Sequence, residues 1–287
     1  MRLVEVRSVL NRRRRRDPWF LDDYSVNPYS GCPLGCVYCY LRGGRYGSWG
    51  EVRAKVNAPE VLDRQLSRRA LRGEFGVVAL GTSTEPYMPA ESGLQLTRRV
   101  LSVVARWRFP VHVLTKATLA RRDADLLLEV SDRAIPPADL RGRLPGGALV
   151  TVSMCSTDPD VARVFEPGAP SPSERLDLVS DLTSQGVPAG VALIPVLPLI
   201  SDSEEEISRA VREAADSGAS YVFVGSLTLY GECKRAFYSV LRARFPGLLP
   251  EYERMYGRGW EAPPEYRERL RRIAEEACAR AGVRFML

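Results

Sequence analysis

The chain has 287 residues, of which 45% are apolar and 26% charged, the composition of a globular protein with an extensive core. It contains no run of about 18 apolar residues, and the arginine-rich N-terminus lacks the apolar segment of a signal peptide, which argues against a membrane span and against secretion. The net charge of +6 is compatible with a polyanionic partner, and six cysteines without a paired framework favour a reducing compartment, so we expect a cytoplasmic monomer.

Residues 1–22 are predicted to form a basic arm, with a short apolar stretch at 3–10 and five consecutive arginines from Arg12 to Arg16. These arginines are either a solvated, mobile segment or a set of contacts to phosphate groups, whose counterions are released on binding. The basic, glycine-rich segment 42–50 is expected to form a flexible rim of the functional site.

A predicted first strand, 24–29, leads into the sequence SGCPLGCVYCYL at residues 30–41. Glycines in this sequence allow a tight loop, which can turn the thiolates of Cys32, Cys36 and Cys39 towards one centre. Thiolates favour zinc or iron–sulfur clusters, and a closed zinc site requires four protein ligands. No second CxxC and no nearby histidine supplies a fourth ligand, whereas a [4Fe–4S] cluster on three cysteines would leave one iron open to a small molecule.

The rest of the chain alternates between strands and helices. The expected strands are 75–80, 110–114, 148–154, 189–197 and 221–224, and the expected helices are 59–72, 93–107, 123–130, 173–185 and 203–215. This alternation predicts a parallel α/β sheet, either a partial barrel or a doubly wound sheet. Helices over 233–245, 249–256 and 264–281 and a strand over 283–286 follow, so we divide the chain into a barrel, 23–226, and a mainly helical C-terminal extension, 227–287.

The motif CxxxCxxC with Tyr38 before its last cysteine resembles the radical S-adenosylmethionine (SAM) superfamily, and CPLGCVYCYL resembles its spore photoproduct lyase-like, or DNA repair photolyase-like, branch. The resemblance implies a partial (β/α)6 TIM-type barrel with a [4Fe–4S] cluster on Cys32, Cys36 and Cys39. Its open iron would hold the amino and carboxylate groups of SAM. An electron from a donor such as ferredoxin or flavodoxin would then cleave SAM to a 5′-deoxyadenosyl radical, which abstracts hydrogen from the substrate.

The resemblance also implies a set of SAM-binding residues, because functional groups of parallel barrels gather at the carboxyl ends of strands. Glu85 would accept from the SAM ammonium group, unless it only caps the next helix. Lys116 would pair with the SAM carboxylate, unless it is a surface lysine. The full set is Tyr38, Thr82, Ser83, Glu85, Lys116, Ser153, Arg175 and Ile194.

Three members of this set have specific alternatives. Ser153 is expected near the ribose or carboxylate of SAM, and Ile194 either lines the adenine face or belongs to the core. Arg175 reaches the SAM carboxylate or pairs with Glu166 as a structural ion pair. The single histidine, His112, lies between two valines and is expected to be a core residue with its polar atoms satisfied.

One position departs from the family pattern. In spore photoproduct lyase a cysteine returns a hydrogen atom to the product radical, and the corresponding residue here is Gly81. Cys155, two residues after Ser153 and on the same face if the strand continues, is predicted as the replacement donor, with Tyr40 as the alternative.

The substrate class is predicted from the resemblance, the basic pI of about 9.1 and the arginine run, which together favour a nucleic acid. The alternatives are a peptide or small metabolite modified by the same chemistry, or a non-enzymatic nucleic-acid-binding protein with a structural metal site.

Overall fold

The computed structural model describes residues 1–43 and 50–287, so most of the expected rim at 42–50 lies outside the described residues. The strands are β1 (Arg2–Val4), β2 (Leu10–Arg12), β3 (Tyr24–Val26), β4 (Tyr29–Ser30), β5 (Arg53–Lys55), β6 (Val78–Leu80), β7 (Val111–Thr115), β8 (Ala148–Met154), β9 (Ala189–Val196), β10 (Tyr221–Ser226) and β11 (Arg284–Phe285).

Helices follow most of these strands. The α-helices are α1 (Ala58–Ala70), α2 (Glu91–Leu94), α3 (Leu96–Arg106), α4 (Ala124–Arg133), α5 (Pro159–Phe165), α6 (Pro172–Ser184), α7 (Glu204–Asp216), α8 (Glu232–Arg244), α9 (Leu249–Tyr256) and α10 (Pro264–Ala281). Short 3₁₀ helices cover Tyr40–Gly43, Thr118–Asp123, Ala138–Leu140 and Pro246–Leu248. Among the described residues, no helix is both long and apolar enough to cross a bilayer.

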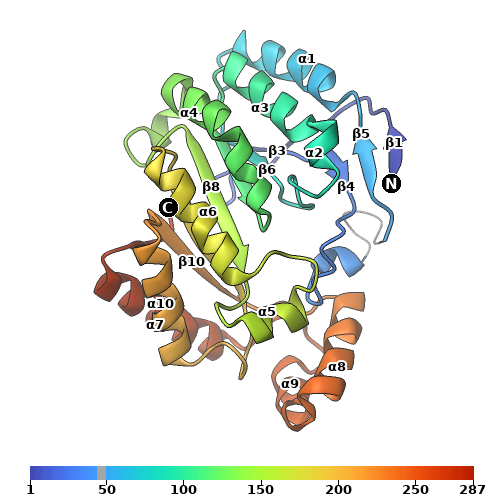
Figure 1. Cartoon of the computed structure of the whole chain (residues 1–287), viewed down its shortest axis with the longest axis vertical. Coiled ribbons are helices and arrows are strands. Elements are labelled where there is room, and N and C mark those ends of the chain that lie inside the picture. Colours follow the sequence, from blue (N-terminus) through green and yellow to red (C-terminus); the bar gives the residue numbers. More distant parts are fainter. Residues whose placement is uncertain (44–49) are drawn as a thin grey trace.

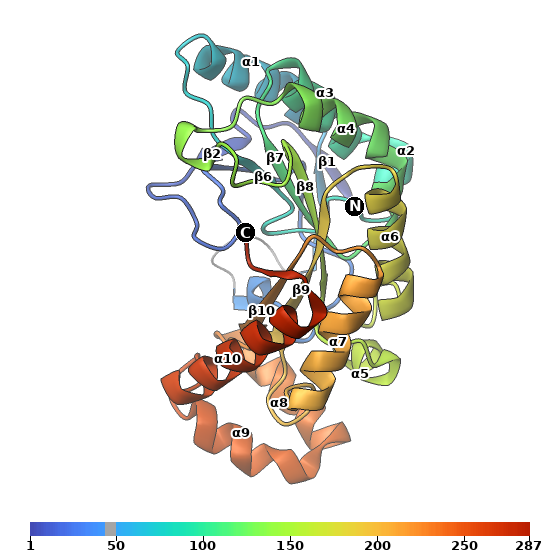
Figure 2. The ribbon, with the colours of Figure 1, turned by 90° about the vertical axis from the view of Figure 1, so that its left-hand side faces the viewer.

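The larger sheet has eight strands in the order β11-β10-β9-β8-β7-β6-β3-β2. The six central strands β3 and β6 to β10 are parallel, and they are the six strands that the sequence predicts. Helices α3, α4, α6 and α7 lie along one face of this curved, open sheet (Figures 1 and 2). The predicted partial (β/α)6 barrel is therefore confirmed, and a smaller sheet β1-β5-β4 lies beside it.

Alternation along β8 shows how the sheet separates core from site. Val150, Val152 and Met154 belong to the main hydrophobic core against the helices. Thr151 and Ser153 point to the other face, where they line a pocket. The same alternation therefore stabilises the barrel and supplies polar groups to its interior.

Two predicted elements are divided in the structure, and one short helix was not predicted. The strand expected at 24–29 is divided into β3 and β4, which belong to different sheets. The helix expected at 93–107 is divided into α2 and α3, because Gln95 between them has a left-handed φ of 51°. The short helix α5 was not predicted, although Asp158 caps its first turn; Ser171 caps α6, in a capping box with Glu174.

The N-terminal segment packs against both sheets. Strand β1 pairs with β5, and β2 pairs with β3 so that Arg12 lies opposite Tyr24, at the amino end of that barrel strand. Arg13 forms an ion pair with Asp22, and Arg16 bonds two further aspartates. The arginine run therefore lies at the opposite end of the barrel from the cysteine loop, which follows the carboxyl end of β3.

His112 is a buried core histidine with both ring nitrogens bonded, as predicted. Its Nδ1–H donates to the carbonyl oxygen of Phe20 (2.9 Å), so its Nε2 accepts from the Thr151 hydroxyl (2.6 Å). Burial holds the pKa of His112 at about 4, below its ordinary value of 6.5.

This depressed pKa predicts a pH dependence of stability. Between pH 6.5 and 4 the unfolded chain binds a proton at His112 that the folded chain does not, so the free energy of unfolding falls as pH falls. We expect a loss of about 2 kcal/mol from this residue between pH 7 and pH 5. Urea denaturation gives the free energy of unfolding of the wild type and of His112→Gln at both pH values. The wild type should lose about 2 kcal/mol more than the variant between pH 7 and pH 5; an equal loss in both proteins would contradict the depressed pKa of His112.

Candidate functional site

The cysteine loop is fixed by contacts to neighbouring backbone. Gly31 has a φ of +74°, and a Cβ atom there would lie 2.3 Å from the carbonyl oxygen of Glu51, so the turn requires glycine. The N–H of Val37 donates to the carbonyl of Phe165 (2.9 Å), which ties the loop to the end of α5. The guanidinium of Arg42 donates to two carbonyls within the loop (3.0 and 3.2 Å).

This loop covers a pocket of about 290 Å³ at the carboxyl ends of the barrel strands, which we call the mouth of the barrel. Arg175 and Cys155 do not line the pocket, but the other predicted site residues do. They are Cys32, Cys36, Tyr38, Cys39, Tyr40, Thr82, Ser83, Glu85, Lys116, Ser153 and Ile194. The structure thus brings residues as far apart in the sequence as Cys32 and Ile194 into one pocket.

The three pocket cysteines fit a [4Fe–4S] cluster. All are free thiols, and burial raises the pKa of each, that of Cys36 to about 12. Metal binding must therefore displace protons from them. Among the described residues, no three His, Cys, Asp or Glu side chains converge closely enough to hold a single metal ion. A four-iron cluster does not need such convergence, because each of its three cysteines binds a different iron.

The carboxylate of Glu85 is buried beneath the pocket and held by three hydrogen bonds. Its Oε1 accepts from the Thr115 hydroxyl (2.5 Å) and the backbone N–H of Tyr87 (2.9 Å), and its Oε2 accepts from the backbone N–H of Lys116 (2.8 Å). Burial raises the pKa of Glu85 although these bonds oppose the shift. A carboxylate has about four acceptor positions, so one position on Oε2 is still open to a ligand ammonium group.

A buried carboxylate, Glu166, connects the loop to the barrel. Its Oε1 accepts from the Tyr38 hydroxyl and lies 2.9 Å from the ammonium of Lys116, and its Oε2 lies 2.7 Å from the Arg175 guanidinium. The same ammonium donates to Ser153 Oγ (2.9 Å), and Arg175 donates to the Ser153 carbonyl (2.7 Å). Four segments of the chain therefore meet at this single side chain.

The charges of this network stabilise one another. Burial alone would raise the pKa of Glu166, but Lys116 and Arg175 outweigh it and hold this pKa at about 2. Burial would lower the pKa of Lys116, but the negative charge of Glu166 outweighs it and the pKa is raised. Both groups are therefore charged at neutral pH, and Lys116 presents a fixed cation to the pocket.

Two predicted residues lie outside the pocket. Arg175 is fully buried in its ion pair with Glu166, which is the structural alternative considered for it. Cys155 is 1% exposed and belongs to a separate hydrophobic cluster with Val37 and Phe165. Strand β8 ends at Met154, so the alternation that suggested Cys155 stops before it. Its role as hydrogen donor stays a prediction.

Tyr40 and the loop after β6 close the pocket from one side. The Tyr40 hydroxyl donates to the carbonyl oxygen of Thr82, and the Tyr40 side chain is 43% exposed. The side-chain amide of Asn27 donates to the hydroxyl of Thr82 (3.4 Å) and accepts from the backbone N–H of Ser83 (3.3 Å). The residue just before the cysteine loop therefore holds the loop after β6 in place. Thr82 and Ser83 thereby keep their hydroxyl groups beside the pocket.

Sequence reasoning missed three residues of the site. Glu166 appeared only as a structural partner of Arg175, because nothing in the sequence links it to Tyr38, 128 residues away. Thr115 ends β7 and holds Glu85, a role that its position at a strand end could have suggested. Phe20 lines the pocket from the N-terminal segment, and no sequence pattern marks it.

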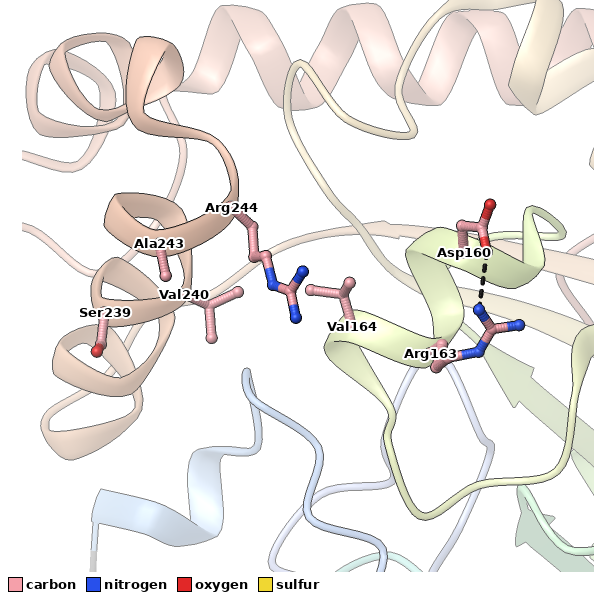
Figure 3. A pocket seen from close by; sticks show the side chains of 7 residues that line it. All are labelled: Asp160, Arg163, Val164, Ser239, Val240, Ala243 and Arg244. Atoms are coloured by element: carbon pink, nitrogen blue, oxygen red, sulfur yellow. Dashed lines mark hydrogen bonds and ion pairs between the residues drawn. The ribbon is translucent and has the colours of Figure 1, made fainter.

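A second hollow, of about 660 Å³, lies on the surface between α5 and α8 (Figure 3). It is wide and open, and its charged lining residues are Asp160, Arg163 and Arg244. Asp160 and Arg163 form an ion pair, whereas the guanidinium of Arg244 extends towards Val164 across the hollow. It contains no thiol, so the chemistry of the cysteines belongs to the smaller pocket.

Two comparisons with known proteins identify the relatives of this chain. The model of the radical SAM superfamily matches residues 26–211. An uncharacterised protein of Mycobacterium tuberculosis is 34% identical over 258 residues, which cover 86% of this chain and 71% of the relative.

Two solved structures have a similar fold. Spore photoproduct lyase complexed with dinucleoside spore photoproduct has a TM-score of 0.66 and 17% identity, covering 92% of this chain and 76% of that one. Streptococcus suis SuiB bound to the precursor peptide SuiA has a TM-score of 0.50 and 15% identity, covering 80% of this chain and 45% of that one. At these identities the likeness shows the fold alone.

The Glu166 network predicts a large loss of stability when its central charge is removed. Glu166→Gln leaves Lys116 and Arg175 without their anion in a buried site, which should lower the free energy of unfolding by about 3 kcal/mol. Asp160→Asn is the control, because the Asp160–Arg163 pair is exposed and should contribute under about 1 kcal/mol. Denaturation by guanidinium compares the two variants; equal losses would show that Glu166 does not hold the site together.

Proposed function

Because the chain belongs to the radical SAM superfamily, we propose that it abstracts a hydrogen atom from a nucleic acid. It is a radical SAM enzyme, and its cofactors are a [4Fe–4S] cluster and SAM. When bound, these supply a 5′-deoxyadenosyl radical. The observation that carries the nucleic-acid proposal is the fold shared, over 92% of the chain, with a lyase that binds a dinucleoside photoproduct.

The pocket residues have distinct roles in this proposal. Cys32, Cys36 and Cys39 hold the cluster. Lys116 has three N–H groups, of which Glu166 and Ser153 occupy two, and the third is available to the carboxylate of SAM. The free acceptor position of Glu85 suits the SAM ammonium group, since charge-assisted hydrogen bonds of this kind are strong.

The apolar and hydroxyl groups of the pocket complete the cofactor site. Ile194, on the strand next to Ser153, offers an apolar surface to the adenine ring, while Thr82 and Ser83 offer hydroxyl groups from the loop after β6. Tyr38 is fixed by its bond to Glu166 and keeps the cysteine loop pressed against the barrel.

The return of hydrogen to a product radical must differ from that in spore photoproduct lyase. Gly81 has a φ of +93°, and a Cβ atom there would lie 2.2 Å from the carbonyl oxygen of Leu114, so a cysteine does not fit this position without movement of the backbone. Tyr40, whose side chain is partly exposed in the pocket lining, is the better placed of the two proposed donors, and Cys155 is the buried one.

A peptide substrate is the second candidate, and the likeness to SuiB with its precursor peptide is the observation that favours it.

The distribution of charge favours the nucleic acid over a peptide. Residues 227–287 contain 12 Lys and Arg against 8 Glu and no Asp, and they therefore carry four of the six net positive charges of the chain. Helix α8 of this segment packs against the 3₁₀ helix at Tyr40–Gly43, beside the cysteine loop.

The proposal predicts where phosphate groups are contacted. Arg242 and Arg244 are exposed on α8, and Arg14 and Arg15 are exposed at the opposite end of the barrel; none of the four has an ion pair within the described part of the chain. The double variant Arg242→Ser, Arg244→Ser should bind a labelled oligonucleotide more weakly than the wild type. The negative slope of log K against log salt should become less steep by about 1.5 to 2.

Arg14→Ser with Arg15→Ser removes the same charge at the far end and should leave the slope close to that of the wild type. Fluorescence anisotropy across a salt series measures both variants. Affinity that does not change with salt, or an equal effect of the two variants, would contradict nucleic-acid contact at the mouth.

A further inference from the structure

We propose that Tyr230, Arg258 and Trp260 form a stacking platform for an unpaired nucleobase at the mouth of the barrel, here called the aromatic platform. The inference rests on the proposed function, because it specifies how a nucleic-acid substrate is held beside the pocket. Residues 227–287 carry no recognisable substrate motif, and the platform gives this segment a defined role.

The aromatic platform lies directly beside the pocket. Ser226 and Thr228, at and beyond the end of β10, line the pocket. Thr228 then forms a β-bridge with Glu261, and the N–H of Leu229 donates to the carbonyl oxygen of Trp260 (2.8 Å). Tyr230 is therefore only two residues, about 7 Å of extended chain, beyond the lining of the pocket.

Both rings are presented to solvent. Tyr230 is 39% exposed and Trp260 is 49% exposed, although residues of these types usually bury most of their surface. Their ring centroids are 6.3 Å apart and their planes meet at 87°. In this edge-to-face arrangement one ring supports the other without covering both of its faces, and an uncovered aromatic face is what a flat base stacks on.

A fixed turn holds Trp260 in position. The ammonium of Lys234 donates to the carbonyl oxygens of Gly257 (2.7 Å) and Gly259 (2.9 Å), which closes the turn between α9 and Trp260. Gly257 has a φ of +42°, a conformation that favours glycine. A turn that is already fixed loses little conformational entropy when a base stacks on Trp260.

Charge at the platform matches a nucleic acid. Arg258 lies between the two glycines of the turn, is exposed, and makes no ion pair among the residues that the structure describes. An exposed guanidinium two residues before Trp260 offers a phosphate contact on the same turn as a stacking surface, and single-strand binding sites combine these two features. Bases inside a duplex present no free face, so the platform suits a single strand or an extruded base.

The test uses the reconstituted full-length protein and fluorescein-labelled oligothymidylate, with the duplex of the same length as a second probe. Trp260→Ala should weaken single-strand binding at least about fivefold at fixed salt, with an unchanged salt slope. Trp260→Phe should retain most of the affinity, and Arg258→Ala should make the negative slope of log K against log salt less steep by about 0.7. Leu71→Ala is the control, since Leu71 is 84% exposed and follows α1, the helix at the opposite end of the molecule from α8 and α9 (Figure 1).

Two results would overturn the inference, and they are distinguishable. If the wild type binds the oligonucleotide, and Trp260→Ala and Tyr230→Ala bind it as tightly as Leu71→Ala does, the platform is rejected and the proposed function stands. Absence of oligonucleotide binding by the wild type at low salt, with 5′-deoxyadenosine still formed from SAM, would reject the nucleic-acid function and the platform together. Thermal denaturation of each variant confirms that it is folded.

Discussion

The buried carboxylate of Glu166 is the interaction on which the site depends. It follows α5, and it binds Tyr38 of the cysteine loop, Lys116 at the end of β7 and Arg175 of α6. A buried anion with two cations and a hydroxyl donor is stable only if all of its partners stay in place, since an unpaired charge in the interior is costly. The loop, the strand ends and the helix layer are thereby held in one arrangement, which keeps the thiols and Lys116 facing the same pocket.

The alternation of side chains along the strands separates the core of the barrel from the site. Alternation along β8 sends Val150 and Val152 to the helices and Thr151 and Ser153 to the pocket, so the core and the site use opposite faces of one strand. Arg242 and Arg244 are exposed on α8, which packs beside the cysteine loop, whereas the arginine run after β2 lies at the far end, partly neutralised by aspartates. This arrangement is the reason why we propose that a polyanion is contacted on the side of the pocket.

Local patterns explain what the sequence predicted well. The cysteine spacing, the alternation of strands and helices, and the polar residues at strand ends each depend on a few adjacent positions. They located the loop, the six strands and eleven of the residues that line the pocket. Contacts between distant segments left no such pattern: the Tyr38–Glu166 bond, the burial of Arg175 and the end of β8 before Cys155 depend on packing. The left-handed Gln95 and the division of 24–29 between two sheets are likewise tertiary effects.

The central claim, radical chemistry on a nucleic acid, is tested most directly by following the abstracted hydrogen atom. The reconstituted enzyme is incubated anaerobically with SAM, dithionite and nucleic acid from cells grown in deuterated medium, and 5′-deoxyadenosine is analysed by mass spectrometry. We expect deuterium in this product with the wild type, and no product with Cys32→Ala, which lacks a cluster ligand. Unlabelled 5′-deoxyadenosine from deuterated nucleic acid, together with labelled product from deuterated peptides, would contradict it.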